Sequence, residues 1–254
     1  MRKQHANNQL AFYITPPHAC GYLPERSAST LFADPTHPMD GRLYTILSQN
    51  GFRRSGGHVY RPHCVSCRAC VPVRIPVAEF RPRRRQRRTW RANCDLRVTR
   101  RAVAFDSEHF ELYRRYLDAR HRGGGMDNPK PRDYVEFLSS PWGETVAYEF
   151  RAAETLVAVA VADVLVNGLS AIYTFFDPDC RKRALGVYAI LWEIAEASRL
   201  GLDWLYLGYW IQDSPKMQYK REYQPQEHLR DGRWIRDGAP PAGSKADPIR
   251  RTRE

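Results

Sequence analysis

Three evenly spaced cysteines precede a dense run of arginines in the first third of the chain. Cys64, Cys67 and Cys70 are three residues apart, and six arginines fall within the eight residues 81–88. Thiolates are the ligands that zinc and iron–sulfur clusters select, and guanidinium groups bind phosphates through paired hydrogen bonds. Together the two motifs predict a soft-metal or redox-sensitive site beside a surface that binds a polyanion.

A metal site needs more ligands than these three thiols supply. A tetrahedral zinc site takes four ligands, and Cys20, in a Cys-Gly-Tyr turn, is the best candidate for the fourth. The run resembles the start of a bacterial ferredoxin motif, but Arg74 stands where that motif requires a cysteine. Zinc or an iron–sulfur cluster held by Cys20, Cys64, Cys67 and Cys70 is one interpretation. The other is that these thiols are small buried residues, as we expect for the remaining two cysteines.

The arginine run fits an exposed arm or loop that contacts an RNA backbone. Like charges at this density repel one another when unpaired, and Pro82 argues against a buried strand. Each phosphate contact would add affinity and salt dependence. The alternative is a charged loop that is simply solvated. The candidate tRNA-binding residues are Arg83, Arg84, Arg85, Arg87 and Arg88.

Composition narrows the class of protein. The 254 residues carry a formal charge of +12 and are 43% hydrophobic. Such a chain can bury one large core or two small ones, and its arginine-rich charge favours a nucleic-acid partner. Its sequence has no apolar run near the ~20 residues that cross a bilayer, and residues 1–8 are polar. We therefore expect a cytoplasmic protein with no membrane contact and no disulfide framework.

Turn residues and short apolar runs divide the N-terminal part into small elements. Strands are expected over 10–15 and 71–77, a short helix over 43–50, and a hairpin over 52–60. Prolines and glycines separate these segments. The pattern predicts a small mixed domain over residues 1–95 that contains the cysteines and lacks a long helix.

Longer elements follow and predict a second domain over residues 96–238, giving an α+β fold. The Asn-Gly pair at 167–168 predicts a tight hairpin. Residues 239–254, rich in proline, alanine and charge, are expected to be a disordered tail. The other expected elements are helices over 105–122, 134–138 and 183–200, and strands over 145–151, 155–166, 169–176 and 204–207.

Three strands, a long helix and a further strand form the order used by GNAT-like folds, the acyl-CoA type of N-acyltransferase. Coenzyme A would call for a glycine-rich phosphate loop before the long helix. Residues 177–186 contain one glycine. Coenzyme A is therefore not expected.

A wider set of motifs resembles the tRNA-dependent aminoacyl–protein transferases. This family comprises the eukaryotic arginyl-tRNA–protein transferases and their bacterial relatives, the aspartate/glutamate leucyltransferases, which match best in length and motifs. The resemblance spans roughly residues 10–235, and its C-terminal motifs are the more specific ones. The motifs are Cys20–Tyr22, Tyr60–Pro62, Cys70–Ile75, Leu185–Ile194, Tyr206–Ile211 and Ser214–Lys220.

The resemblance implies transfer of leucine from leucyl-tRNA to a protein whose first residue is Asp or Glu, which marks that protein for degradation by the N-degron route. It also implies a GNAT-like catalytic fold without coenzyme A. The eukaryotic pattern reads Cys-Gly-Tyr-Cys, whereas Leu23 follows Tyr22 here, so the metal ligation of those relatives is not implied. Two other classes stay open: a non-catalytic RNA-binding module with a structural metal site, and an acyl-CoA-dependent N-acetyltransferase.

Aminoacyl transfer starts from an activated ester, so positioning matters most and no cofactor is required. The amine must lose a proton, the oxyanion needs donors, and the acidic side chain of the acceptor needs a cation. Asp213 is the candidate base, with Asp177 as the alternative, and Tyr206 and Tyr219 are candidate donors. The candidate substrate-binding residues are Arg61, Arg74, Lys216, Lys220, Gly208 and Tyr209.

Overall fold

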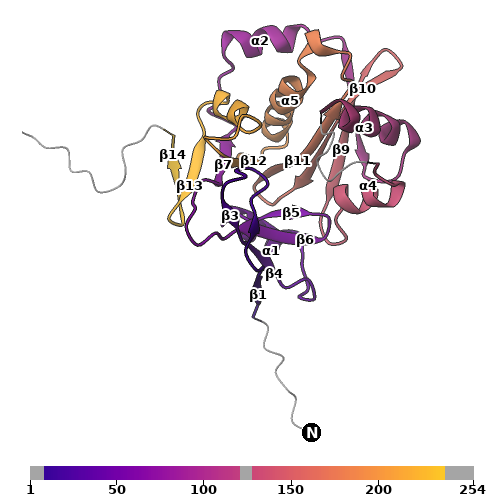
Figure 1. Ribbon diagram of the computed structural model, residues 1–254. Helices are drawn as coiled ribbons and strands as arrows, with labels where there is room; N and C mark the ends of the chain where they lie inside the picture. The colour runs from indigo at the N-terminus through magenta and orange to yellow at the C-terminus, as the bar shows by residue number, and fades with distance from the viewer. Residues whose placement is uncertain (1–8, 121–127, 238–254) are drawn as a thin grey trace, which may run out of the picture.

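The computed structural model of the protein describes residues 9–120 and 128–237. The tail expected over 239–254 lies outside these residues. The chain is a mixture of helices and sheets, with most helices gathered around the larger sheet (Figure 1). None of the helices in the described ranges is long and apolar enough to cross a membrane.

Eight strands form the larger sheet, in the order β14-β13-β7-β12-β11-β10-β9-β8. The strands β8 to β11 are successive antiparallel neighbours, whereas β12 joins β11 in parallel and β7 antiparallel. The strands are β7 (Val71–Pro76), β8 (Leu96–Ala102), β9 (Thr145–Ala152), β10 (Thr155–Val164), β11 (Gly168–Phe176), β12 (Trp204–Trp210), β13 (Glu227–Arg230) and β14 (Arg233–Arg236).

Helices cover both faces of this sheet, because its central strands are apolar on both sides. In β10, Ala158 and Ala160 belong to a core shared with α5, while Val159 and Val161 belong to a core shared with α3 and α4. The helix α2 packs on α5 (Figure 1). The helices are α1 (Gly41–Gln49), α2 (Arg84–Arg91), α3 (Ser107–Arg120), α4 (Pro131–Leu138) and α5 (Leu185–Arg199), and the short 3-10 helices are η1 (Arg181–Arg183) and η2 (Gln218–Glu222).

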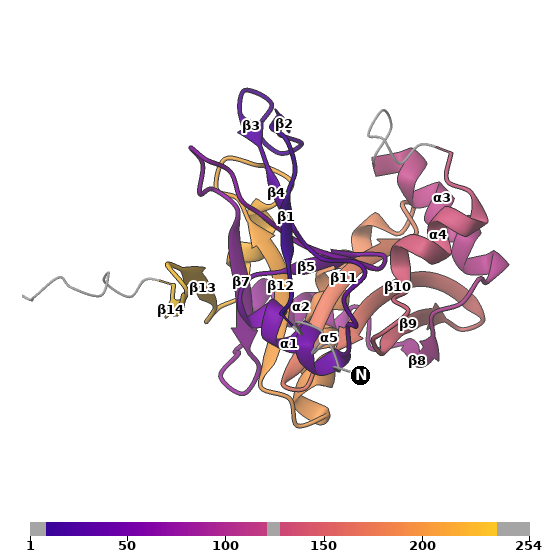
Figure 2. The same cartoon turned by 90° about the horizontal axis from the view of Figure 1, so that it is seen from below.

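A four-stranded sheet, in the order β1-β4-β6-β5, packs against one end of the larger sheet. Tyr44 of α1 and Phe52 share a core with Leu165 and Tyr206 from the larger sheet. In Figure 2 the small sheet lies beside β11 and β12. The remaining strands are β1 (Phe12–Ile14), β4 (Thr30–Ala33), β5 (Arg53–Ser55) and β6 (His58–Pro62), with β2 (His18–Ala19) and β3 (Ser27–Ala28) forming a separate pair.

The first part of the chain also contributes a strand to the middle of the larger sheet. β7 lies between β12 and β13, with Ile75 opposite Leu205 and Arg74 opposite Glu227. Val73 and Ile75 belong to the core beneath α5. The two sheets therefore do not divide the chain at residue 95, the boundary expected from the sequence.

The strands β11 and β12 separate along their length. They pair over Gly168–Ser170 and Trp204–Tyr206, and both strands continue beyond this ladder. Gly208 has a φ of +80° and coincides with a shift in the register between β12 and β7. Glycine adopts this conformation without steric cost. We refer to the place where the two strands part as the β11–β12 split.

The arginine run is a helix, which corrects the loop expected from the sequence. The side chain of Gln86 is buried, accepts a hydrogen bond from the Arg83 N–H (2.8 Å) and donates one to the Glu222 carbonyl (3.2 Å). Pro82 precedes the first turn, where it does not interrupt the helix, and arginine is a good helix former. The charged side chains therefore project from a packed helix.

Most of the longer elements expected from the sequence are confirmed. The helices expected over 105–122, 134–138 and 183–200 correspond to α3, α4 and α5, and the Asn-Gly pair lies in the hairpin between β10 and β11. The hairpin of β13 and β14 is an addition that the sequence patterns did not indicate.

Candidate active site

An arginine from the small sheet reaches the β11–β12 split. Arg53 lies on the edge strand β5, and its guanidinium donates to Ser170 Oγ (3.4 Å) and to the Ala171 carbonyl (2.5 Å) of β11. Across the split stands Gly208 of β12, where a Cβ atom would lie 3.1 Å from Arg53 Cζ. The guanidinium therefore lies between the two strands, close to where their ladder ends.

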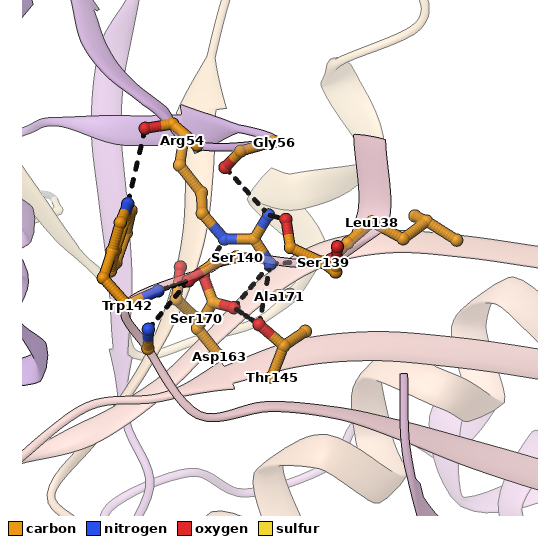
Figure 3. A network of polar contacts seen from close by, with 12 residues as sticks. Arg54, Gly56, Leu138, Ser139, Ser140, Trp142, Thr145, Asp163, Ser170 and Ala171 are labelled. Carbon is orange, nitrogen blue, oxygen red and sulfur yellow. Dashed lines mark hydrogen bonds and ion pairs between the residues drawn. The ribbon is translucent and has the colours of Figure 1, made fainter. Parts of the chain in front are cut away.

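The neighbouring Arg54 fixes this geometry from the other side of β5. Successive residues of a strand point to opposite faces. Arg54 forms a bidentate pair with Asp163 of β10 (2.6 and 2.7 Å), and both side chains are buried. Figure 3 shows its guanidinium also donating to the carbonyls of Leu138 (2.8 Å) and Ser139 (3.1 Å) at the end of α4. This network ties β5 to the larger sheet and so holds Arg53 at the split.

A buried carboxyl lies on α5, the helix that packs on β11 and β12. Glu193 is 0% exposed, and neither of its carboxyl oxygens has a hydrogen-bond partner among the described residues. Burial raises the pKa of Glu193 to about 8, and the nearby positive charge of Arg53 opposes this rise. At neutral pH the carboxyl therefore holds a proton and is mostly uncharged.

A buried amine comes from η2, which follows β12 in the chain. Lys220 is 6% exposed, and its Nζ donates to the Tyr209 carbonyl (2.7 Å). Burial lowers the pKa of Lys220 to about 7, and the charge of Arg53 adds to this effect. A large fraction of the amine is therefore uncharged near pH 7, and an uncharged amine can accept a proton.

Tyr219 lies beside Lys220 and brings a hydroxyl to the same region. Its ring is 44% exposed, but burial of the hydroxyl end raises its pKa to about 12, with Tyr116, Arg53 and Glu193 among the groups that act on it. The hydroxyl therefore remains protonated at neutral pH and can donate a hydrogen bond.

We call Arg53, Glu193, Tyr219 and Lys220 the split cluster. The charge of Arg53 acts on each of the other three members. In the part of the chain that the structure describes, neither Arg53 nor Lys220 has an acidic side chain at ion-pair distance. A guanidinium without a counter-ion attracts an anion, so the cluster combines an anion site with a proton acceptor.

Of the four predicted catalytic residues, Tyr219 belongs to this cluster and the other three lie elsewhere. Tyr206 is near the closed end of the strand pair, where its hydroxyl donates to a side chain of the β10–β11 turn (3.4 Å). Asp177 follows β11 and forms an ion pair with Arg115 of α3 (2.8 Å). Asp213 is exposed in the turn after β12. The catalytic roles of these residues stay predictions.

A basic pocket of about 490 Å³ lies beside the cysteine segment, and Arg61, Arg68, Arg230 and Tyr209 are among the residues that line it. Tyr209 connects this pocket to the split cluster. Its hydroxyl donates to the Gly51 carbonyl, between α1 and β5 (2.8 Å), and its own carbonyl accepts the hydrogen bond from Lys220. Two of the predicted substrate-binding residues, Arg61 and Tyr209, therefore share one concave surface.

The predicted substrate-binding residues Arg74 and Lys216 are placed differently. Arg74 forms an ion pair with Glu227 (2.7 Å), and its guanidinium carbon lies 3.6 Å from the ring centre of Trp204 and 4.3 Å from that of Trp234. This guanidinium is therefore already paired with a carboxylate of the same protein. Lys216 is exposed in the turn before η2. Gly208 and Lys220, by contrast, lie at the split.

The four candidate metal ligands lie near one another. Burial raises the pKa of Cys70 to about 12, and charges at Cys20, Cys64 and Cys67 add to the effect. All four are free thiols. Within residues 9–120 and 128–237 they do not form a group spaced to hold an ion. The four sulfurs suit zinc or an iron–sulfur cluster by their chemistry, so metal binding stays a prediction.

The arginine-rich face of α2 lies next to the segment that carries Tyr219 and Lys220. Gln86 of α2 bonds to η2, and Phe80, just before α2, stacks on Tyr223, just after η2, with 6.4 Å between ring centres. These contacts therefore hold α2 against η2, the segment that carries two members of the split cluster. The exposed arginines of this face are Arg83, Arg84, Arg85, Arg87 and Arg88.

Arg53 and Glu193 are not among the residues predicted from the sequence, although each leaves a signal there. Two adjacent arginines in an expected hairpin require one of them to face inward, because side chains alternate along a strand. Glu193 lies four residues from both Ala189 and Ala197, which are 0% exposed. A glutamate on the small-residue side of an apolar helix is unusual, because glutamates are almost never fully buried without a partner.

Side chains from the two halves of the chain meet in the split cluster, and family models match both halves. The N-terminal model of the arginine-tRNA-protein transferases matches residues 18–88, and the C-terminal model matches residues 108–230. The chain therefore belongs to the arginine-tRNA-protein transferase family, as its sequence motifs indicated.

Within that family the chain is similar to bacterial proteins of one kind. It is 54% identical over 224 residues to the aspartate/glutamate leucyltransferase of Nitrosococcus oceani, covering 88% of this chain and 94% of that protein. It is 53% identical over 227 residues to that of Pseudomonas fluorescens, covering 89% and 97%. The solved structure of L-PGS from Bacillus licheniformis aligns with a TM-score of 0.42 and 11% identity over 57% of this chain and 46% of that one, a likeness too small to assign a fold.

Proposed function

We propose that the protein transfers leucine from leucyl-tRNA to the first residue of proteins that begin with Asp or Glu. The observation that carries this proposal is the similarity to aspartate/glutamate leucyltransferases over most of both chains. The split cluster supports it, because Arg53 comes from the segment matched by the N-terminal model and Lys220 from the segment matched by the C-terminal model. The product carries a new N-terminal leucine, which marks it for degradation by the N-degron route.

The reaction is an aminolysis of an ester. The α-amine of the acceptor attacks the carbonyl carbon of the leucyl ester, so a C–N bond forms and the C–O bond to the terminal ribose breaks. The attacking nitrogen becomes positively charged as the C–N bond forms and then loses a proton, and the ribose oxygen leaves with a proton. The α-amino group has an unperturbed pKa near ~8, so a nearby proton acceptor raises the fraction of reactive amine.

Two members of the split cluster suit these steps. Lys220 is the proton acceptor of the proposal, because its buried amine is partly uncharged at neutral pH and its hydrogen bond to the Tyr209 carbonyl leaves the lone pair free. Tyr219 is a hydroxyl donor for the developing oxyanion. Asp177 suits the base role less well, because its carboxylate is already paired with Arg115.

The tRNA is proposed to lie along α2 and reach the split cluster past η2. The exposed arginines of α2 supply phosphate contacts, and the hydrogen bond from Gln86 to the Glu222 carbonyl supports this path, because it joins α2 to η2, the segment that carries Tyr219. We propose a GNAT-like catalytic sheet, because four successive antiparallel strands are followed by α5 and the parallel strand β12. We also propose that this sheet uses no coenzyme A. We expect the enzyme to act in the cytoplasm.

Zinc or an iron–sulfur cluster at Cys20, Cys64, Cys67 and Cys70 remains part of the proposal as a structural group, because the aminolysis itself needs no metal. Such a group would hold the cysteine segment against the basic pocket. Elemental analysis and an optical spectrum of anaerobically purified protein measure its presence. A protein that contains neither metal nor cluster under these conditions contradicts this part.

Transfer of labelled leucine tests the central proposal. Purified protein is incubated with leucyl-tRNA and with peptides that begin with Asp, Glu or Ala but are otherwise identical. Leucine is expected on the Asp and Glu peptides alone, seen by mass spectrometry. Arginyl-tRNA is the matched donor control. If no charged tRNA supports transfer while tRNA still binds, the protein is a non-catalytic RNA-binding module, and acetylation from acetyl-CoA would instead indicate an N-acetyltransferase.

A further inference from the structure

We infer that Arg53, held in the β11–β12 split, binds the side-chain carboxylate of the acceptor's first residue and so selects Asp and Glu. The inference rests on the proposed function and deepens it, since it names the residue that reads the substrate. It adds Arg53 to the substrate-binding candidates expected from the sequence, whose cationic members are Arg61, Arg74, Lys216 and Lys220.

Two adjacent arginines show the difference between a structural and a ligand-binding guanidinium. Arg54 has a carboxylate from its own chain, Asp163, in a bidentate pair, and its other donors meet backbone carbonyls. Arg53 has two neutral acceptors, the Ser170 hydroxyl and the Ala171 carbonyl, at 3.4 and 2.5 Å. A guanidinium has five N–H donors. Arg53 therefore keeps donors for a further acceptor, and its charge has no counter-ion in the described residues.

The surroundings of Arg53 favour an anion that arrives from outside. Glu193 is the acidic group whose charge interacts with Arg53 from α5, but its carboxyl is mostly protonated at neutral pH because it is buried. Lys220 supplies no negative charge either. The cluster therefore carries net positive charge, which favours a charge-assisted bidentate hydrogen bond to an anion.

The Arg53 guanidinium packs closely on the backbone of β12. Gly208 has no side chain, and a Cβ atom there would lie 3.1 Å from Arg53 Cζ. Tyr209 follows it, and its buried hydroxyl lies within the influence of the Arg53 charge. Lys220 bonds to the backbone of Tyr209 (2.7 Å). Arg53 and the proposed proton acceptor therefore contact adjacent residues of β12, Gly208 and Tyr209.

The other candidate cations fit this role less well. Arg74 is already paired with Glu227, and Arg61 lines the more open basic pocket. A phosphate of the tRNA is the competing ligand for Arg53. The exposed arginines of α2 serve an RNA backbone without burial, whereas Arg53 is one guanidinium between two strands. That setting suits a single carboxylate.

Discrimination between acidic and neutral peptides tests the inference. The variants Arg53→Gln and Arg53→Lys are assayed with leucyl-tRNA and peptides that begin with Asp, Glu or Asn. For Arg53→Gln, KM for the Asp and Glu peptides is expected to rise about 10- to 100-fold, the value of a lost charge-assisted hydrogen bond. The ratio of kcat/KM for Asp over Asn should fall by a similar factor. Arg53→Lys keeps the charge but not the fork, so an intermediate rise is expected.

Controls separate this role from folding and from tRNA binding. Arg132→Gln changes an exposed arginine on α4 and should leave KM unchanged. The Kd for leucyl-tRNA should be the same in wild type and Arg53→Gln. If Arg53→Gln loses tRNA affinity while its Asp-to-Asn ratio stays at the wild-type value, Arg53 binds phosphate and the inference is overturned. If Arg53→Gln does not fold, an unchanged KM and ratio in Arg53→Lys overturns it equally.

Failure of the proposed function has a different signature. In that case the wild-type protein transfers no leucine to any of the peptides, whereas failure of the inference leaves wild-type transfer intact and the discrimination of the Arg53 variants unaltered. The wild-type assay is therefore run first, and the variants are compared with it at equal protein concentration.

Discussion

Glu193 and Lys220 are ionisable side chains that the fold removes from water, and neither has a counter-ion among residues 9–120 and 128–237. Burying such groups costs free energy, and most proteins avoid it by pairing the charges. Here each group instead shifts toward its uncharged form, because burial raises the pKa of Glu193 and lowers that of Lys220. Strongly shifted groups of this kind gather at functional sites more than elsewhere, which agrees with their position at the split.

The first prediction concerns the pH dependence of stability. The pKa of Glu193 is about 8 in the folded protein against an ordinary value of 4.5. Between these values the folded protein holds a proton that the unfolded chain has released, so the free energy of unfolding falls as pH rises. Glu193→Gln should remove this fall in stability. The slope of the free energy of unfolding against pH should change by up to about 1.4 kcal/mol per pH unit.

Urea unfolding at pH 5.0, 5.5 and 6.0 measures this slope, because Lys220 is still largely protonated there in the folded and the unfolded protein. The matched control is Glu25→Gln, which alters an exposed glutamate near β3 and should leave the slope as in wild type. Parallel slopes in wild type and Glu193→Gln would contradict a protonated buried carboxyl.

At the residue scale the sequence predicted part of the candidate site. Gly208, Tyr219 and Lys220 could be predicted because they lie in specific motifs in the C-terminal part of the sequence. Arg53 and Glu193 were not, because their significance depends on packing. Arg53 matters through contact with a strand far along the sequence, and Glu193 through the complete burial of one face of α5. Neither property can be read from local composition.

Among the elements, α2 concentrates the basic charge of the molecule. Its arginines are exposed, and Arg85 has a distant acidic neighbour, Glu222 at 4.0 Å. The helix is held by Gln86, the buried member of the run. Charge on a packed helix keeps a fixed spacing, which suits contact with successive phosphates better than a mobile loop does.

Removal of this charge should weaken tRNA binding and its salt dependence together. Each lost phosphate contact lowers the slope of log Kd against log salt by about 0.7 to 0.9, so the fivefold alanine variant is expected to lose up to about 3.5 to 4.5 from the slope. Fluorescence titration of tRNA at several salt concentrations measures it. The residues to change are Arg83, Arg84, Arg85, Arg87 and Arg88.

The control for this variant must remove charge without touching α2. Arg114→Ala and Arg132→Ala alter exposed arginines on α3 and α4, which pack on the sheet face opposite α5. The slope should stay near the wild-type value in this double variant. An equal drop per charge removed in the two proteins would mean that the tRNA responds to net charge rather than to the helix.

The elements themselves were largely predictable, with instructive exceptions. Long periodic segments such as α3 and α5 were identified, as was the hairpin between β10 and β11, because their patterns are local. The arginine run was expected to be a loop, since charge repulsion was weighed without knowledge of the buried Gln86 side chain. The domain boundary near residue 95 could not anticipate that β7 pairs with β12, because strand pairing between distant segments leaves no local signal.

At the scale of the whole molecule, the Arg54–Asp163 pair joins the small sheet to the larger one. Arg54→Met should destabilise the protein by about 3 to 5 kcal/mol, because it leaves Asp163 buried without a partner. Urea unfolding monitored by tryptophan fluorescence provides the measurement. The double variant Arg54→Met with Asp163→Leu is expected to recover part of the loss. A single variant as stable as wild type would show that the pair does not join the sheets.

The position of β7 has a consequence for how the protein comes into being on the ribosome. β7 is synthesised well before both of its neighbours, β12 and β13. Until then both edges of β7 are unpaired. Pairing between strands that lie far apart in the sequence is slow in folding. The wall of the split formed by β12 is thus completed only after β12 itself has been made, so a product terminated before that strand is left without a working centre.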